Sequence, residues 1–400
     1  MLNRILPPHP LLPRRFWPAF VLLLLACGLF SPVLALPSVA TTTSTPLVIA
    51  HRGASAYLPE HTLEAKALAY GMRPDYIEQD LVLSKDGHLI VMHDIYLDQI
   101  TDVAERFPGR AREDGRFYTI DFTLPELKQL CVTEAFERNG SELTQKHPGR
   151  FPLWKSSFQL ATFNEEIELI QGLNQSLGYD IGIYPEIKKP WFHHREKRDI
   201  AKRTLEVLQQ YGYRDRQQKV YLQSFDAEEL QRIDRELMPQ MNMDIPLVQL
   251  IAETSWGEKK VEHDGILSNY RYDWMHTPEG LKKISGYADA IGPSAMMLAQ
   301  LGITGLTASP LHRHAKKLGL PIHAYTFRAD SLPKAIRGLL SFEDILSLFS
   351  GPLAIDGFFT DNPDRVRAFL DARSSESQSQ SKSQRQPQSQ PQSQSPHPAP

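Results

Sequence analysis

Short apolar runs rich in Val, Ile and aromatic residues alternate along the chain with longer segments of helical period. Eight runs follow one another, and each except the last has a helical or partly helical segment behind it. They are LVIAHR (47–52), YIEQDLVLS (76–84), IGIYPEIK (181–188), KVYLQSF (219–225), IPLVQLI (245–251), ADAIGPS (288–294), PIHAYTFR (321–328) and DGFFTDNP (356–363). Eight strand–helix units predict an α/β fold of the (β/α)8 TIM-barrel class. An open, doubly wound sheet is the alternative, but no glycine-rich phosphate loop follows the first run.

Capping residues mark the boundaries of two of the predicted helices. The first is expected from about Thr62 to Tyr70 and ends at Gly71. The second is expected from Asp226 to Leu237, where Asp226 suits the N-cap and Glu229 suits the third helical position. We find no repeat of 20–50 residues beyond the strand–helix alternation itself.

The stretch from 76 to 94, YIEQDLVLSKDGHLIVMHD, predicts a β-hairpin around Asp86-Gly87. Side chains on a strand alternate between its faces, so Glu78 and Asp80 share one face. A two-residue type I′ loop would place Asp80 opposite His93 and bring all three polar side chains to the same face. Taken alone, this pattern also fits a solvated outer face of an edge hairpin.

Residues 95–160 interrupt the alternation with a long polar segment. It carries one clear short helix, from about Thr123 to Leu130, which Thr123 and Glu126 open as a capping box. We expect this loop-rich insertion to follow the second-strand hairpin and to cover the mouth of the barrel. The barrel domain would then span residues 45–372, with the insertion at about 95–160.

Both ends of the chain differ in composition from this central part. Residues 1–35 combine early arginines, the apolar run FWPAFVLLLLACGLF and small residues before position 36, which predicts a secretory signal peptide. A retained membrane anchor is the alternative, although the unbroken apolar run is shorter than the ~20 residues of a spanning helix. The sequence Leu-Leu-Ala-Cys ending at Cys27 also resembles a lipobox, which would attach a lipid there. Residues 374–400, rich in Ser, Gln and Pro, are predicted to be disordered.

Composition narrows the possible compartments and partners. The chain has 400 residues, 41% of them hydrophobic, which suffice for one large core. A net charge of −3 gives no argument for nucleic-acid binding. Cleavage after Ala35 would leave Cys131 as the one cysteine, and therefore no intrachain disulfide. We expect an exported protein, periplasmic first and lipid-anchored or extracellular as alternatives. The sequence does not indicate an oligomeric state.

Polar residues fall at the ends of the first three predicted strands and of the hairpin. Catalytic groups of (β/α)8 barrels lie at the carboxyl ends of the strands, so these residues could converge on one mouth. They are His51 and Arg52, Glu78 and Asp80, His93, and Glu186 and Lys188.

These residue types suggest three kinds of chemistry. Three carboxylates form an all-oxygen set, which suits Ca²⁺ or Mg²⁺ better than zinc. His51 and His93 suggest a general acid and a general base. Arg52 and Lys188 add positive charge for an anionic group, and phosphate fits best. A structural salt-bridged cluster of the carboxylates with both cations, and structural histidines, are the alternatives.

Five motifs resemble, in order and spacing, those of the glycerophosphodiester phosphodiesterases, most closely the bacterial periplasmic type. They are HRGASAYLPEHT, YIEQDLVLSKDGHLIVMHD, YPEIK, LQSF and GFFTDNP, and the resemblance covers about residues 45–372. It implies a barrel that hydrolyses glycerophosphodiesters, such as glycerophosphocholine and glycerophosphoethanolamine, to glycerol 3-phosphate and an alcohol. It also implies a bound divalent ion, Ca²⁺ before Mg²⁺, and a small-molecule substrate as the partner.

The resemblance assigns a role to each candidate residue. It implies that the metal is bound by Glu78, Asp80 and Glu186, with His51 and His93 as acid and base and Arg52 on the phosphate. Lys188, Gln223 in LQSF and Tyr325 in HAYTF are further candidates for phosphate or substrate binding. The chain departs from many members at His61, where asparagine is common, and at Tyr325, where a tryptophan often contacts glycerol.

Two other functions use a similar set of residues. A phospholipase D-like lyase for lipid head groups shares the His, Glu, Asp and His pattern, but such enzymes rely on disulfides. A non-catalytic exported protein that binds glycerophosphodiesters or calcium would keep the carboxylates and the cations without needing both histidines.

Overall fold

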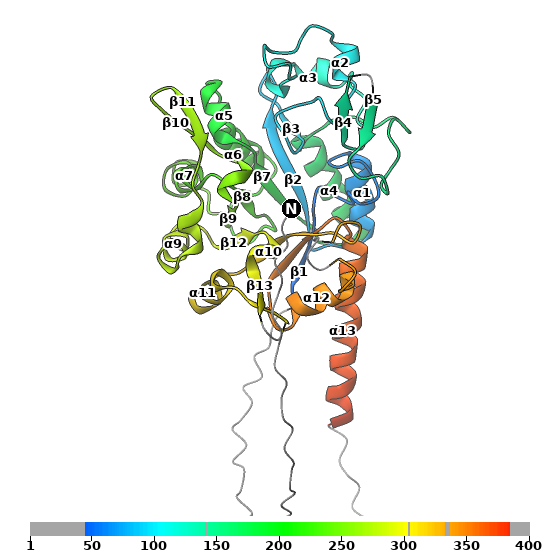
Figure 1. Ribbon diagram of the computed structural model, residues 1–400, viewed down its shortest axis with the longest axis vertical. Coiled ribbons are helices and arrows are strands. Elements are labelled where there is room, and N and C mark those ends of the chain that lie inside the picture. The colour runs from blue at the N-terminus through cyan, green and yellow to red at the C-terminus, as the bar shows by residue number, and fades with distance from the viewer. Residues whose placement is uncertain (1–44, 141, 303–304, 333–336, 385–400) are drawn as a thin grey trace, which may run out of the picture. The chain divides into compact units, whose positions relative to one another are not determined.

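The computed structural model describes residues 45–140, 142–302, 305–332 and 337–384, and its centre is a closed barrel of parallel strands (Figure 1). The strands are β1 (Leu47–Ala50), β2 (Tyr76–Leu83), β7 (Gly182–Ile187), β8 (Leu222–Ser224), β9 (Leu247–Ile251), β12 (Ala290–Pro293), β15 (His323–Phe327) and β16 (Gly357–Thr360). They pair in the order β12-β9-β8-β7-β2-β1-β16-β15. Parallel bridges Ile291–Ile322 and Ser294–Tyr325 then join the two edges. The prediction of a (β/α)8 barrel from eight apolar runs is confirmed.

Aromatic rings fill the inside of the barrel, so it is a packed core and not a pore. The ring centroid of Tyr184 lies 4.9 Å from that of Phe359 and 5.0 Å from that of Tyr221. Tyr76, Ile49, Val248 and Ala290 belong to the same buried cluster. An apolar filling at this level leaves the carboxyl ends of the strands as the place for polar side chains.

Helices pack on the outer face of the barrel and form its second hydrophobic layer. They are α1 (Leu63–Gly71), α4 (Phe163–Leu177), α5 (Pro190–Arg195), α6 (Ile200–Gln210), α7 (Ala227–Arg232), α8 (Met238–Met241), α9 (Pro278–Ile284), α10 (Ala295–Leu298), α11 (Pro310–Leu318), α12 (Phe342–Ser350) and α13 (Pro363–Gln384). Thr62 caps α1, and Asp226 caps α7 by accepting from the amides of Glu228 and Glu229, as their positions predicted.

Short elements complete the connections between barrel strands. A π-helical segment (Ile233–Leu237) joins α7 to α8, so the predicted helix from Asp226 to Leu237 is present. Two small hairpins, with two 3₁₀ turns (Thr254–Trp256 and Asp273–His276), occupy loops that follow strands. The hairpins are β10 (Lys260–His263) with β11 (Ile266–Asn269), and β13 (Ala299–Gly302) with β14 (Gly305–Ala308).

The hairpin between β2 and β3 (Leu89–Val91) has a different register from the predicted one. Leu81 pairs with Val91, so Asp80 is level with Met92 and not with His93. The loop therefore holds three residues, 85–87, and the prediction of a two-residue loop is wrong. Its third residue, Gly87, has a φ of +84°, a left-handed conformation that glycine adopts at no steric cost.

The insertion contains more structure than its sequence predicted. Its elements are α2 (Val103–Arg106), a 3₁₀ turn (Thr119–Asp121), α3 (Leu124–Leu127), β4 (Phe136–Asn139), β5 (Glu142–Gln145) and β6 (Ala161–Thr162). The capping box of α3 is confirmed. The expectation of a single helix is wrong, because α2 has only four residues and shows no helical period. The insertion has its own apolar core, which includes Phe117, Phe122 and Phe158.

The last strand is also followed by a helix, which corrects the prediction for the C-terminal end. In α13, Val366 and Leu370 lie one turn apart and are buried against the barrel. The hydroxyls of Ser374 and Ser375 donate to carbonyls one turn earlier, at 3.0 Å each. Because α13 continues to Gln384, the disordered tail does not begin at residue 374. A few buried side chains early in the helix were enough to anchor it, which the polar composition concealed.

Three predictions concern residues outside the described ranges: the signal peptide at 1–35, a lipid on Cys27, and the tail from 385 to 400. Cys131 is a free thiol. Within the described ranges, no helix is both long enough and apolar enough to cross a bilayer.

Candidate active site

A cavity of about 550 Å³ opens at the carboxyl ends of the barrel strands, and all nine candidate residues line it. They are His51, Arg52, Glu78, Asp80, His93, Glu186, Lys188, Gln223 and Tyr325. Strand register explains much of this convergence. Asp80 on β2 is level with Glu186 on β7, which is level with Gln223 on β8. His93 reaches the cavity from the residues that follow β3, despite the changed hairpin register.

The three carboxylates are crowded and almost entirely buried. Burial, followed by the nearby charge of Asp80, raises the pKa of Glu78 well above its usual value. Burial also raises the pKa of Glu186 to about 8, although Lys188 Nζ lies 2.7 Å from its Oε1. Burial would raise the pKa of Asp80 as well, but Lys188 and His61 hold it well below its usual value. Burial and mutual repulsion therefore oppose the ionisation of Glu78 and Glu186 when the side chains stand alone.

Two buried oxygens that lack a hydrogen bond test whether these residues fit a divalent cation. Asp80 Oδ1 and Gln223 Oε1 are buried and make no hydrogen bond in the described part of the chain. Leaving a buried oxygen without a donor costs free energy, and a hard cation would satisfy it while offsetting the repulsion between carboxylates. The residues fit such an ion.

His61 and Lys66 form a support behind the carboxylates that the sequence did not reveal. The ligand atoms of His61, Glu78 and Asp80 lie within 4.8 Å of one another, whereas Glu186 is outside this group. However, both ring nitrogens of His61 are engaged. Its Nε2 lies 2.8 Å from Asp80 Oδ2, and its Nδ1 lies 3.2 Å from Lys66 Nζ.

The partners of His61 fix its tautomer and its part in the site. Burial and then Lys66 lower the pKa of His61 to about 4, so the ring is neutral at neutral pH. Lys66 Nζ donates to Nδ1, which leaves the proton on Nε2 to be donated to Asp80. Lys66 is itself fully buried and also contacts the carbonyl of Glu78 and the carboxylate of Glu166. His61 thus orients Asp80 and directs its other oxygen into the cavity.

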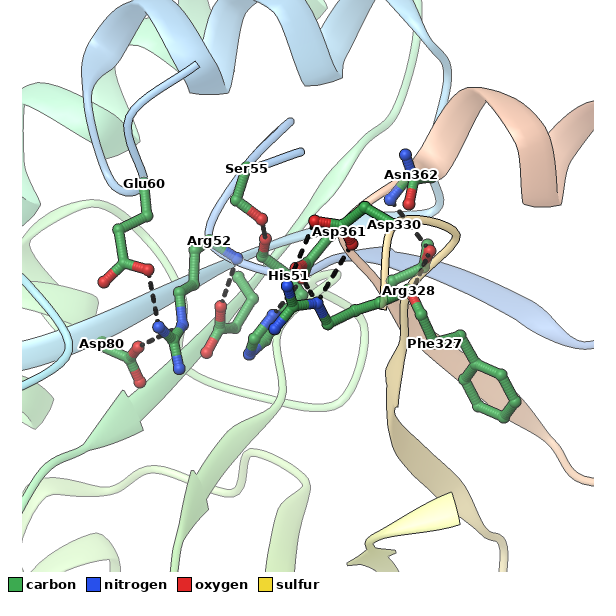
Figure 2. Close-up of polar contacts among 12 residues, drawn as sticks. His51, Arg52, Ser55, Glu60, Asp80, Phe327, Arg328, Asp330, Asp361 and Asn362 are labelled. Atoms are coloured by element: carbon green, nitrogen blue, oxygen red, sulfur yellow. Dashed lines mark hydrogen bonds and ion pairs between the residues drawn. The ribbon is translucent and has the colours of Figure 1, made fainter. Parts of the chain in front are cut away.

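The two histidines have different surroundings. His51 Nδ1 lies 2.6 Å from Asp361 Oδ1, across the seam between the first and the last strand (Figure 2). Burial and then Arg52 lower the pKa of His51, and Asp361 opposes them. Within the described ranges, no hydrogen bond joins His93 to a carboxylate; burial, Arg52 and Lys188 lower its pKa well below the usual value, and Asp80 opposes them.

Asp361 lies in the GFFTDNP motif, yet the sequence did not assign it a role. Two arginines hold its other oxygen: Arg150 at 2.5 Å and Arg328 at 3.3 Å. Arg150 comes from the insertion and also donates to the carbonyl of Ser55. Burial would raise the pKa of Asp361, but His51 and the two arginines hold it far below its usual value. The insertion therefore contributes directly to the support of His51.

Arg52 is held by carboxylates on one side of the cavity. Figure 2 shows its guanidinium between Glu60 and Asp80, with distances of 2.7 Å from NH1 to Glu60 and 3.5 Å from Nε to Asp80. Its backbone amide donates to Glu78 Oε2 at 2.6 Å. Glu60, whose role the sequence left undefined, is thus the partner of Arg52.

Aromatic rings form the far wall of the cavity. Tyr325 donates its hydroxyl to the carbonyl of Ile251 at 2.7 Å, so the ring rather than the hydroxyl faces the cavity. Phe225 and Trp256 pack edge-on against it, with centroids 6.0 and 6.5 Å away. The sequence did not predict a role for these two: Phe225 ends the apolar run 219–225, and Trp256 lies in the 3₁₀ turn that follows β9.

The model of the glycerophosphoryl diester phosphodiesterase family matches residues 51–365. The chain belongs to this family. A glycerophosphodiester phosphodiesterase of Haemophilus influenzae is 49% identical over 82% of this chain and 90% of its own length. One of Treponema pallidum is 43% identical over 83% of this chain and 94% of its own. The chain is accordingly an enzyme with glycerophosphodiester phosphodiesterase activity.

A solved phosphodiesterase of Oleispira antarctica, in complex with its product sn-glycerol 3-phosphate, shares the fold. Its TM-score is 0.52 at 20% identity, with 82% of this chain and 97% of that chain covered. The family uses a divalent metal, and the acidic and histidine groups described above are candidates for its ligands. The lyase and the non-catalytic binding protein that the sequence also allowed gain no support from these relatives.

Proposed function

We propose that this family member hydrolyses glycerophosphodiesters with a polar alcohol, such as glycerophosphocholine and glycerophosphoethanolamine, to glycerol 3-phosphate and the free alcohol. The observation that carries the proposal is the level row of Asp80, Glu186 and Gln223, with its unpartnered oxygens, beside a histidine anchored by Asp361. The glycerol 3-phosphate bound in the Oleispira phosphodiesterase supports the glycerol half of the substrate.

Calcium suits this set of oxygens better than magnesium. Ca²⁺ accepts six to eight oxygen ligands in flexible geometry, amide oxygens included, whereas Mg²⁺ demands a strict octahedron and keeps several waters. Glu78, Asp80 and Glu186 would hold the ion, with Gln223 Oε1 as a further oxygen. When bound, the ion would polarise the phosphoryl oxygens and offset the charge that grows on them.

Arg52 and Lys188 position the phosphate. Both cations line the cavity, and the carboxylates that flank them keep their charged ends in place. Charge-assisted hydrogen bonds from a fixed guanidinium and ammonium stabilise the additional negative charge of the transition state.

His51 acts as the base and His93 as the acid. With Nδ1 of His51 bonded to Asp361, its Nε2 accepts a proton from the attacking water while the water oxygen forms its bond to phosphorus. The bond from phosphorus to the alcohol oxygen breaks, and His93 gives its proton to that oxygen. In the free enzyme, burial and then Arg52 and Lys188 lower the pKa of His93. An anionic phosphodiester bound beside the two cations would offset their influence on this pKa.

The experiment measures glycerol 3-phosphate released from both substrates by purified protein with Ca²⁺, with Mg²⁺ and with chelator. We expect calcium-dependent product, and His51→Ala or His93→Ala should lose ~10²- to 10⁴-fold in kcat while still binding calcium. Product at the same rate with chelator would refute the metal assignment. Binding of substrate without product under any metal would instead support a binding protein.

We also propose that the protein is exported to the periplasm. This rests on the sequence pattern of residues 1–35 alone. Intact mass after expression in a bacterium would show a new N-terminus after Ala35, whereas a lipid-modified N-terminus at Cys27 would indicate an anchored form. An uncleaved chain would contradict export by either route.

A further inference from the structure

A second cavity, of about 780 Å³, adjoins the first and is built largely by the insertion. Tyr96, Gln99, Arg116, Ala135, Lys146 and His147 line it. We propose that this cavity binds the alcohol half of the substrate, and that it is suited to hydroxylated or zwitterionic alcohols. The inference rests on the proposed function and extends it from the reaction to the class of leaving group.

Two residues line both cavities and connect them. Among their lining residues, only Arg52 and His93 occur in both. A phosphodiester is one phosphate with two substituents, and the phosphate of this substrate would lie at Arg52. One substituent can then extend into each cavity without crossing the barrel mouth.

His93 decides which substituent occupies which cavity. The proton donor must stand beside the oxygen that leaves, and His93 lies where the two cavities meet. His51 lines the first cavity but not the second. The glycerol half therefore faces the aromatic wall of Tyr325, and the departing alcohol faces the insertion.

The second cavity is polar and carries both signs of charge. Lys146 Nζ donates to Gln99 Oε1 at 2.7 Å, and Arg116 lies over the Tyr96 ring at 3.7 Å. The carboxylates of Glu60 and Asp94 also line it. A wall with donors, acceptors and charges of both signs matches hydroxyl groups or a zwitterion, whereas an apolar chain would offer these groups no hydrogen bonds.

The walls of this cavity are held in place by the same contacts that support His51. Arg150 fixes the insertion to Asp361 and to the carbonyl of Ser55. Lys189 Nζ holds Asp94 Oδ1 at 2.8 Å. The cavity is therefore formed before the substrate binds, which limits the entropy lost on binding.

The test compares three substrates that share glycerol 3-phosphate and differ in the alcohol: a methyl ester, the choline ester and the inositol ester. The variants are Lys146→Ala, which removes an exposed donor, and Ala135→Trp, which fills the cavity. Lys155→Ala, an exposed lysine elsewhere on the insertion, is the matched control. KM and kcat are measured for each substrate, together with the inhibition constant of sn-glycerol 3-phosphate.

We expect Ala135→Trp, which fills the cavity, to raise KM for the inositol ester by about tenfold or more. Lys146→Ala should raise it less, because this variant loses one contact, and one good contact is worth up to about tenfold. KM for the methyl ester and the inhibition constant of glycerol 3-phosphate should stay within about twofold of wild type, a change too small for a lost contact. A parallel rise in the inhibition constant would place the glycerol half in this cavity and overturn the inference. Variants equal to wild type on all three esters would overturn it as well. Failure of the wild-type enzyme on every ester would refute the proposed function instead.

Discussion

Replacing Asp361 by Asn removes one negative charge from the pair that holds His51 and leaves the size of the side chain unchanged. The carboxylate is 3% exposed and lies 2.6 Å from His51 Nδ1. An amide can still bond to the ring, but it would not stabilise the imidazolium that the proposed proton transfer to His51 creates. The variant therefore isolates the charge of Asp361 from its packing.

The structure sets the size of the expected loss. Two unit charges at about 4 Å attract by ~4 kcal/mol at an effective dielectric constant of ~20. Each ~1.4 kcal/mol of lost transition-state stabilisation lowers the rate about tenfold, so kcat should fall by about 10³. This is within the ~10²- to 10⁴-fold that a general base typically contributes. KM should change little. The charge of Asp361 acts on the imidazolium in the transition state, whereas the His51 ring that meets the bound substrate is uncharged.

The same carboxylate also neutralises Arg150, so stability and catalysis must be separated. Asp330 supplies the control: in the described part of the chain it bonds to Arg150 at 2.8 Å and to Arg328 at 3.2 Å, and His51 is not among its partners. Asp330→Asn should lower the melting temperature and keep kcat within about threefold of wild type, since surface-accessible ion pairs contribute ~1 kcal/mol or less.

The assay is steady-state release of glycerol 3-phosphate at saturating Ca²⁺, with thermal melting and calcium titration on the same samples. Loss of kcat in Asp361→Asn, with calcium affinity retained, is the expected result. If Asp361→Asn and Asp330→Asn lost equal factors in kcat, Asp361 would act only by holding the insertion. A kcat within about threefold of wild type, less than 1 kcal/mol, would refute the reasoning altogether.

Four further outcomes follow from the described contacts. Lys66→Met releases His61 and should weaken calcium binding, measured by calorimetry, by ~10- to 100-fold, because contacts behind metal ligands support the ligands. An unchanged calcium affinity would contradict the role given to His61. Gly182→Ala places a methyl carbon 2.5 Å from the Tyr76 ring and should lower the unfolding free energy by ~1–3 kcal/mol. The control Gly172→Ala, in open space on α4, should not destabilise the protein. Equal melting temperatures of the two variants would argue against the clash. Chelator should lower the melting temperature and Ca²⁺ restore it, because a ligand that binds only the folded state stabilises it; no shift would speak against a bound ion. Folding depresses the pKa of Asp361, so the stability that its carboxylate contributes is present above the unfolded pKa near ~4 and is lost as the pH falls below it. Acid should therefore destabilise wild type more than Asp361→Asn. Parallel curves of stability against pH for the two proteins would contradict the depressed pKa.

The sequence predicted the barrel and the convergence of its candidate residues because both depend on local rules. Alternation of apolar runs identified all eight strands, and the two-residue spacing of Glu78 and Asp80 placed these carboxylates on one face of their strand. Parallel register then brought Asp80 level with Glu186 without any further information. Their roles in binding and catalysis remain predictions.

The parts that the sequence missed depend on contacts between distant segments. Asp361 meets His51 and Arg150 only because the barrel closes and the insertion folds back, which no local pattern records. Lys66 resembled an ordinary helical lysine until its burial against His61 was known. The hairpin register is a local feature: Gly87 suits a two-residue or a three-residue turn, and the sequence favoured the wrong one.

The contact between His51 and Asp361 also has a consequence for the order in which the chain becomes an enzyme. His51 follows the first barrel strand and Asp361 follows the last, whose pairing closes the circle. All three candidate carboxylates for the metal are made in the first half of the chain, long before Asp361 emerges. A growing or truncated polypeptide would thus contain its candidate metal ligands while His51, the proposed base, still lacked its contact with Asp361. If His51 is the base, as proposed, hydrolysis requires the completed ring, and the onset of turnover would report when the barrel closes.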